Sequence, residues 1–356
     1  MDKFEYRPSR YGALNAFMVQ SKDPTGILTE ELKQKARTSI GNTLETPVID
    51  YDADITIGST RTLTIADSEN TSKMVQITFT TYSWGFTIAP AMYMNNEIGI
   101  QKDFETKFMK YLYALAKKLD EAAIAALAAA KTQVLKNELL YDWSGNAINA
   151  KWTERENVFG DLEVMMGAND FYGQLHIVGD PGVESIMRKL QQHGLYNDVN
   201  KQNEFGTKIV HLTNNIAAAG GKYAQGYAVN AGSLGMLTRF ERDCLLGTVS
   251  GDGHEWGIAT LPLLNMPVGT YFYDSVGDYN AIAGAATADM TRTRKEHYGF
   301  AVDVAFLTAY NSEPSTLASP ILAFNVSSED AVYAKPVVVM NTTDNPVNTK
   351  EAGAGA

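Results

Sequence analysis

The sequence is poor in the residues that most site chemistry needs. Cys244 is the only cysteine among 356 residues, which excludes a disulfide or a thiolate metal cluster within one chain. The net charge is −11 and no run of Lys and Arg occurs, so no strip could neutralise successive phosphates of a nucleic acid. The first ten residues lack the apolar core of a signal peptide, and no later run is long enough to span a bilayer. We therefore expect a protein of a reducing cytoplasm that contacts no membrane.

Motifs of catalysis and metal binding are also missing. No serine lies in a G-x-S-x-G elbow, since the segment 230–236 (NAGSLGM) lacks the first glycine. The Gly-rich segment 217–222 (AAAGGK) lacks the phosphate-loop pattern, and it predicts a turn or an exposed loop. No histidine is paired with another ligand at the spacing of a metal motif; the histidines are His176, His193, His211, His254 and His297. We predict no catalytic residues, no cofactor and no metal.

Acidic residues in three places have structural interpretations. Residues 179–182 (GDPG) could present backbone N–H groups to an anion. Alternatively, Asp180 caps a helix whose first residue is Pro181. The carboxylate pairs on helices are expected to face solvent; they are Glu30 with Glu31 and Asp120 with Glu121.

What the sequence does contain is core-forming material. Hydrophobic residues make up 45% and charged residues 20%, which places the chain outside the range of disordered proteins. The length suffices for one large domain or two lobes.

The N-terminal part has two different patterns. Residues 1–26 show no sustained period and predict an extended arm. Its apolar side chains pack either on their own body or on a neighbouring subunit. Thr29 then caps a short helix that Gly41 ends.

Residues 46–90 change to a β pattern, rich in β-branched and aromatic residues. The most polar part, 66–73 (ADSENTSK), is the expected tip or connecting loop. The segment is either an arm that projects onto another subunit or an ordinary antiparallel sheet of its own domain.

Residues 102–137 contain the strongest single signal. Apolar residues recur there at helical spacing, and neither Gly nor Pro interrupts them. We predict one long helix of about 50 Å that packs on a sheet.

The remainder alternates helix and strand patterns. A short helix is predicted within 154–170, ending near Gly167, and a strand followed by a capped helix within 174–194. Strands are predicted further along, at 207–213, 223–231, 234–240, 255–264, 293–311, 321–327 and 333–341. This pattern indicates an α/β lobe at roughly 160–285, inserted into a lobe built from both of its flanks.

The order of these elements resembles the major capsid proteins of tailed bacteriophages, which share the Hong Kong 97 fold with encapsulins. Three segments carry the resemblance: 95–131 with its long helix, 175–198 (LHIVGDPGVESIMRKLQQHGLYND) and 292–311 (RTRKEHYGFAVDVAFLTAYN). The match extends over residues 28–311.

The resemblance implies an α+β, Hong Kong 97-like capsid fold. Its parts would be an N-terminal arm with a short helix (1–45), an extended β loop (46–90), a peripheral domain (91–155 plus 286–356, with a spine helix at 102–137) and an axial α/β domain (156–285).

The resemblance also implies a structural protein without enzyme activity. Subunits would form pentamers and hexamers of an icosahedral head shell, assembled in the bacterial cytoplasm and retained in the virion. The implied partners are a separate scaffolding protein, a portal, a decoration protein, and double-stranded DNA enclosed without sequence-specific binding. An encapsulin-like shell around protein cargo and a monomeric α/β enzyme remain the alternatives.

Under this resemblance the arm and the β loop would supply contacts between subunits. The candidate contact residues are Phe4, Tyr6, Tyr11, Phe17, Arg61, Asp67, Glu69 and Lys73. Some relatives join subunits through a Lys–Asn isopeptide bond. Lys73 lies in the loop, but no partner Asn or catalytic Glu can be assigned, so we predict no crosslink.

Overall fold

The computed structural model describes most of the chain. The described residues are 11–24, 26–39, 41–49, 72–93, 97–131, 141–144, 147–168, 171–194, 208–217, 219–240, 244, 253–262, 264–279, 291–309 and 319–328.

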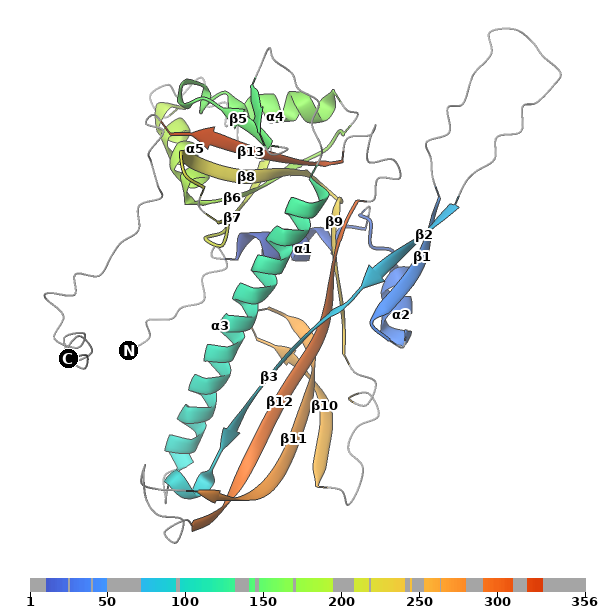
Figure 1. Cartoon of the computed structure of the whole chain (residues 1–356), viewed down its shortest axis with the longest axis vertical. Coiled ribbons are helices and arrows are strands. Elements are labelled where there is room, and N and C mark those ends of the chain that lie inside the picture. The colour runs from blue at the N-terminus through green and yellow to red at the C-terminus, as the bar shows by residue number, and fades with distance from the viewer. Residues whose placement is uncertain are drawn as a thin grey trace, which may run out of the picture.

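The molecule is elongated, and one long helix connects its two ends (Figure 1). Helix α3 (Glu97–Ala130) runs from an α/β lobe at one end along a sheet of long strands toward the other end. A two-stranded hairpin, β1 with β2, projects sideways from the region where the two parts meet.

The long strands form an antiparallel sheet beside the first half of α3. Its order is β10 (His254–Leu261), β11 (Met266–Tyr279), β12 (Thr291–Thr308) and β3 (Thr80–Ile88), and β9 (Leu234–Arg239) pairs with the later part of β12. Alternation along β12 places one set of side chains against α3. Val302 and Val304 belong to this set, and both are buried in the cluster that contains the helix leucines.

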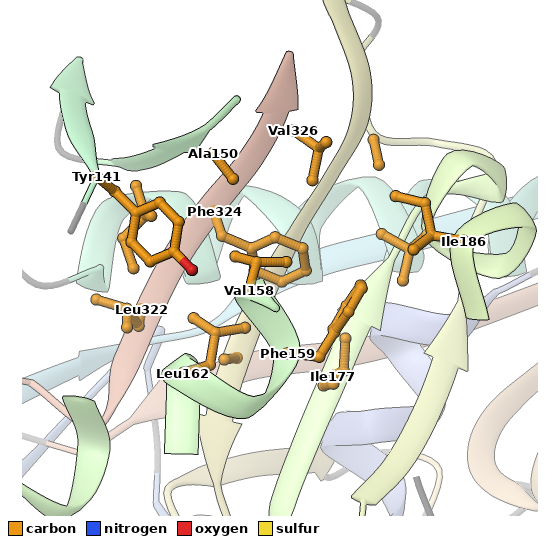
Figure 2. Close-up of a cluster of buried hydrophobic side chains, with 14 of the residues drawn as sticks. Tyr141, Ala150, Val158, Phe159, Leu162, Ile177, Ile186, Leu322, Phe324 and Val326 are labelled. Atoms are coloured by element: carbon orange, nitrogen blue, oxygen red, sulfur yellow. The ribbon is translucent and has the colours of Figure 1, made fainter. Parts of the chain in front are cut away.

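The α/β lobe is a mixed six-stranded sheet covered on both faces. Its order is β4 (Asp142–Ser144), β5 (Ala147–Ala150), β13 (Ile321–Ser327), β8 (Lys222–Asn230), β6 (Leu175–Gly179) and β7 (Lys208–Leu212). Helices α4 (Val158–Gly167) and α5 (Pro181–Gly194) supply side chains to one face. There Phe159 meets Phe324 edge to face at a centroid distance of 5.7 Å (Figure 2).

Helix α3 confirms the predicted spine, with changed limits. It begins at Glu97 rather than at residue 102, and residues 132–140 lie outside the described part of the chain. Its buried stripe, Leu112, Leu115, Leu119, Ala123 and Leu127, follows the predicted helical spacing. At 1.5 Å per residue the helix is about 51 Å long. Within the described residues, no helix combines the length and the apolar character that crossing a membrane requires.

The prediction of an extended arm over 1–26 is wrong for its second half. Residues Gly12–Gln20 form helix α1, which is buried between α3 and the strands. Because α1 is surrounded on several sides, its buried residues do not form one stripe, and the sequence shows no helical period. Gly12 is required here: a Cβ atom would lie 2.5 Å from the backbone carbonyl of Leu212.

The N-terminus of α1 is capped from another helix. The Asp120 carboxylate of α3 accepts hydrogen bonds from Leu14 N (2.9 Å), Thr213 Oγ1 (2.5 Å) and Asn215 Nδ2 (2.8 Å). Asp120 has no exposed surface, so its predicted solvent-facing position is wrong, whereas Glu121 is exposed as expected. Burial raises the pKa of Asp120, and the hydrogen bonds oppose this shift.

The strand pairing divides the chain differently from the expected domain boundaries. Strands β9, β10 and β11, expected in an axial domain at 156–285, belong to the sheet beside α3. Strands β4, β5 and β13, expected in a peripheral domain at 91–155 plus 286–356, belong to the α/β sheet. Sheet membership depends on long-range pairing, which local patterns do not contain.

We predict that Asp120→Ala lowers the free energy of unfolding by about 3 kcal/mol, because two buried donors and one half-buried donor lose their acceptor. Urea denaturation of purified subunits measures the change. Glu121→Ala, on the next position of the same helix, is the matched control and should change stability by less than about 0.5 kcal/mol. Equal effects of the two substitutions would contradict the capping role.

Candidate assembly surfaces

The hairpin of β1 (Thr43–Ile49) and β2 (Ser72–Thr78) forms a separate two-stranded sheet that projects from the body of the subunit. Its register runs from Thr43 opposite Thr78 to Ile49 opposite Ser72. Among the described residues no third strand joins this pair, so each strand keeps one edge free for another chain. This agrees with the predicted β excursion, although β3, expected within it, pairs with β12 in the long sheet.

The base of the hairpin rests on helix α2 (Glu30–Thr38). Thr29 Oγ1 accepts a hydrogen bond from Leu32 N at 3.2 Å, which confirms the predicted cap. Leu44 and Ile77 of the hairpin are buried with Ala36 of this helix. The helix and the hairpin base therefore form one packed unit.

Arg239 fixes this unit to the long sheet. Its Nε donates to Asp303 Oδ2 at 3.0 Å, and its Nη1 donates to Ser39 Oγ at 2.9 Å. Nη2 lies 3.5 Å from Asn42 Oδ1, and the guanidinium stands 4.3 Å above the ring of Phe79. The side chains of Arg239 and Asp303 are only 8% and 17% exposed, so this ion pair is shielded from solvent screening. One arginine thus contacts β12, the end of α2, the start of β1 and the junction of β2 with β3.

The sheet face turned away from α3 carries a row of aromatic rings and histidines. Tyr273 stacks on His297 at a centroid distance of 4.3 Å, and Trp256 contacts Tyr271 at 4.4 Å. His254 stacks on Tyr271 at 5.5 Å. Helix α3 covers the opposite face of the sheet, so these side chains are half-buried only by contacts with one another.

Large apolar side chains are exposed far apart on the subunit. Met74 of the hairpin is 58% exposed and Val276 of β11 is 74% exposed. On the α/β lobe, Val164 and Tyr172 are 68% and 75% exposed. Hairpin, long sheet and lobe each carry apolar surface that a single subunit leaves in water.

The structure describes only part of the predicted contact set. Tyr11 (7% exposed) and Phe17 (0%) are buried in the core of their own subunit, which replaces the expectation that they contact a neighbour. Phe17 meets Phe306 edge to face at 5.0 Å. The backbone of Lys73 lies in β2, where it pairs with Val48. The other candidates lie outside the described residues; they are Phe4, Tyr6, Arg61, Asp67 and Glu69.

The segments with possible ligand chemistry have structural roles. Asp180 Oδ1 accepts a hydrogen bond from Val183 N at 3.1 Å, so the carboxylate takes the capping position that an anion would use. Gly221 has a positive φ of 73° in the turn before β8, as the turn interpretation of 217–222 predicts. Searching the described residues finds no group of three His, Cys, Asp or Glu side chains that could hold a metal ion.

Two histidines that are distant in sequence form a buried pair. His176 Nδ1 lies 3.1 Å from His211 Nε2, and both residues are 4% exposed. Asn15 Nδ2 of α1 lies 3.4 Å from His211 Nδ1. Burial and the neighbouring His176 lower the pKa of His211 to about 4, and burial lowers the pKa of His176. Each ring is therefore neutral at pH 7.

Sequence reasoning missed Arg239 and this histidine pair. Both lie in strands that read as ordinary β segments, and their partners come from far along the chain. The only available signal was a charged or titratable residue within an apolar strand pattern.

Comparisons with known proteins give a distant structural likeness. No family model and no curated protein sequence match the chain. A structure from Microbacterium phage Oxtober96 is 13% identical, with a TM-score of 0.46, over 92% of this chain and 95% of that one. The capsid of Myoviridae phage XM1 is 14% identical, with a TM-score of 0.45, over 85% and 95%. The capsid of cyanophage P-SCSP1u is 13% identical, with a TM-score of 0.43, over 82% and 85%.

We predict that Arg239→Met destabilises the subunit by about 2–3 kcal/mol, because the mostly shielded Asp303 carboxylate loses its cation and keeps only the hydrogen bond from Thr81. Arg294→Met is the matched control. Arg294 donates a hydrogen bond to Asp274 at 2.6 Å, but this pair is exposed to solvent, so its loss should leave the free energy of unfolding nearly unchanged. Chemical denaturation of the two variants provides the comparison. If Arg239→Met were as mild as the control, the proposed anchoring of the hairpin base would be wrong.

We predict that the free energy of unfolding falls as the pH is lowered from 6.5 to 4. In this range histidines of the unfolded chain bind protons, whereas the buried His211 ring, with its lowered pKa, stays neutral. The pKa of His211 drops from 6.5 to about 4, which corresponds to about 3 kcal/mol lost over this range. His211→Gln should flatten the profile of unfolding free energy against pH in this range. His254→Gln, on the outer sheet face, is the control for replacing a histidine outside the buried pair. The carboxylate of Asp23 acts in the opposite direction to burial, since it raises the pKa of His176.

Proposed function

We propose that this chain is the major capsid subunit of a tailed bacteriophage, which assembles into a closed icosahedral shell around double-stranded DNA. The observation that carries the proposal is the β1–β2 hairpin, which projects from the body with strand edges that no described residue pairs. A second chain that pairs with such an edge supplies the missing hydrogen bonds.

The order of elements supports the same conclusion. Helix α2, the hairpin, spine helix α3, the α/β lobe and the long returning strand β12 follow one another as the resemblance implies. Arg239 anchors the base of the hairpin to the long sheet, so a contact between the hairpin and a neighbouring subunit is connected to the core of its own subunit.

The surface suits repeated self-contact better than catalysis. Met74, Val276, Val164 and Tyr172 lie on different elements, so neighbours on several sides could cover them. The net charge of −11 prevents an inner wall from adhering to the nucleic acid that it encloses. Within the proposal, subunits form pentamers and hexamers and require a separate scaffolding protein and a portal.

The test is negative-stain electron microscopy with size-exclusion chromatography, on the chain expressed alone and with its neighbouring genes. Closed shells, or rings of five and six subunits, are expected. A stable monomer under every condition would overturn the proposal and favour the α/β enzyme. Particles that hold protein cargo in place of nuclease-protected DNA would identify an encapsulin-like shell.

We predict that residues 50–71, which join β1 to β2, are needed for closure of the shell but not for folding of the subunit. Ile49 and Ser72 are register partners, so an Asn-Gly turn can replace residues 50–71 and leave β1 and β2 paired. The variant should keep its melting temperature but form no closed shells. A Gly/Ser segment of equal length should fail as well, because it restores length but no contacts, whereas Met74→Leu should assemble. Shells of normal size from the shortened variant would contradict this role.

A further inference from the structure

An aromatic groove lies between the first turns of α3 and the long sheet. A cleft of about 430 Å³ is lined by Phe104, Glu255 and residues 270–272 and 298–300. A second cleft of about 290 Å³ adjoins it, since Phe104 and Tyr298 line both. Because α3 lies over β3 and β12, the groove opens over β10 and β11.

The groove is an incomplete part of the core. Tyr298 contacts Phe104 and Phe272, each at a centroid distance of 5.1 Å, and Phe108 contacts Phe300 at 5.4 Å. All five rings are only partly buried. Phe108 and Phe300 nevertheless pack directly against the cluster that contains the buried leucines of α3. Aromatic rings of this size contribute most when water is excluded from them, so the groove is suited to a further apolar segment.

Tyr11 is the described residue from which the first ten residues extend; its backbone bridges to Thr213, and its side chain packs beside α3. Its hydroxyl lies 3.5 Å from the Tyr113 carbonyl oxygen of α3, and its side chain is in the cluster against which Phe108 and Phe300 pack. Phe104 is nine residues nearer the helix N-terminus than Tyr113, which is about 14 Å along the axis. At about 3.3 Å per extended residue, Tyr6 can lie up to about 17 Å and Phe4 up to about 23 Å from Tyr11, which covers the distance to Phe104.

The chemistry of residues 1–10 (MDKFEYRPSR) fits the groove. Phe4 and Tyr6 alternate, so an extended chain presents both on one face. The segment holds three basic side chains (Lys3, Arg7 and Arg10) and two acidic ones (Asp2 and Glu5). Its net positive charge complements Glu255 in the groove wall and Glu296, which accepts a hydrogen bond from Tyr298. Residues 94–96, which precede α3, and residues 280–290, which join β11 to β12, contain no aromatic residue.

We propose that residues 1–10 lie in the groove of their own subunit, with Phe4 and Tyr6 packed against the rings of Phe104, Phe272 and Tyr298. The segment would then complete the core beside the spine helix. This inference does not depend on shell formation, because it concerns contacts within one chain.

The test places a photo-reactive benzoyl-phenylalanine at Phe4 of the full chain and identifies crosslinked peptides by mass spectrometry. Crosslinks to 97–107, 254–261, 266–279 or 291–300 are expected. They should exceed those from the same probe at Tyr172 by about tenfold or more, since a tethered segment has a millimolar effective concentration. Tyr172 is 75% exposed on the α/β lobe and serves as the matched control.

Mixing isotopically light and heavy chains distinguishes the two possible donors of the segment. Links that join light to light and heavy to heavy only support docking within one subunit. Links between light and heavy chains in statistical proportion would show that a neighbour donates the segment, and would overturn the proposal. Absence of crosslinks to the groove would overturn it as well.

A second measurement uses amide hydrogen exchange. The double variant Phe4→Ser with Tyr6→Ser should exchange faster in β11 and β12 beside the groove, by about tenfold where the segment covers the strands. Ile258→Ser, at a 47% exposed site on the opposite face of the sheet, is the control and should leave these rates unchanged. Unchanged exchange in the double variant would contradict the proposal.

Discussion

The burial of α1 is the constraint on which the rest of the structure depends. This helix lies between α3, the α/β sheet and the start of β9, and its side chains take part in the cores on both sides. Its first N–H groups cannot reach water there, so the Asp120 carboxylate of α3 accepts from them. The same carboxylate binds Thr213 and Asn215, which follow β7. One buried acid therefore joins the N-terminal helix, the spine helix and the α/β lobe.

A second polar contact holds the projecting hairpin. Arg239 belongs to β9, and the start of β9 is bound to the end of α1. Gln20 Oε1 accepts a hydrogen bond from Leu234 N, and Ser21 Oγ accepts one from Met236 N. The helix, β9 and the hairpin base are thus connected through successive contacts. A rigid base matters for the proposed assembly, because strand pairing with a neighbour is strongest when the offered edge is ordered beforehand.

The subunit leaves several surfaces incomplete, and each has a different character. The hairpin offers backbone edges, the outer sheet face offers stacked rings and histidines, and the α/β lobe offers the exposed side chains of Val164 and Tyr172. For a monomeric enzyme such surfaces would be a liability, since they favour association. For a shell subunit they are the material from which contacts are made.

The sequence alone determined the elements whose signals are local. Helical spacing from Phe104 to Ala130 determined α3, and the side chains of Thr29 and Asp180 determined the starts of α2 and α5. Only the tertiary structure decided that Gly12–Gln20 is a helix, since a helix buried on several sides has no amphipathic period. Only it assigned β9, β10 and β11 to the spine sheet and paired Arg239 with Asp303 and His176 with His211. These features arise from contacts between distant residues, whose partners no local pattern identifies.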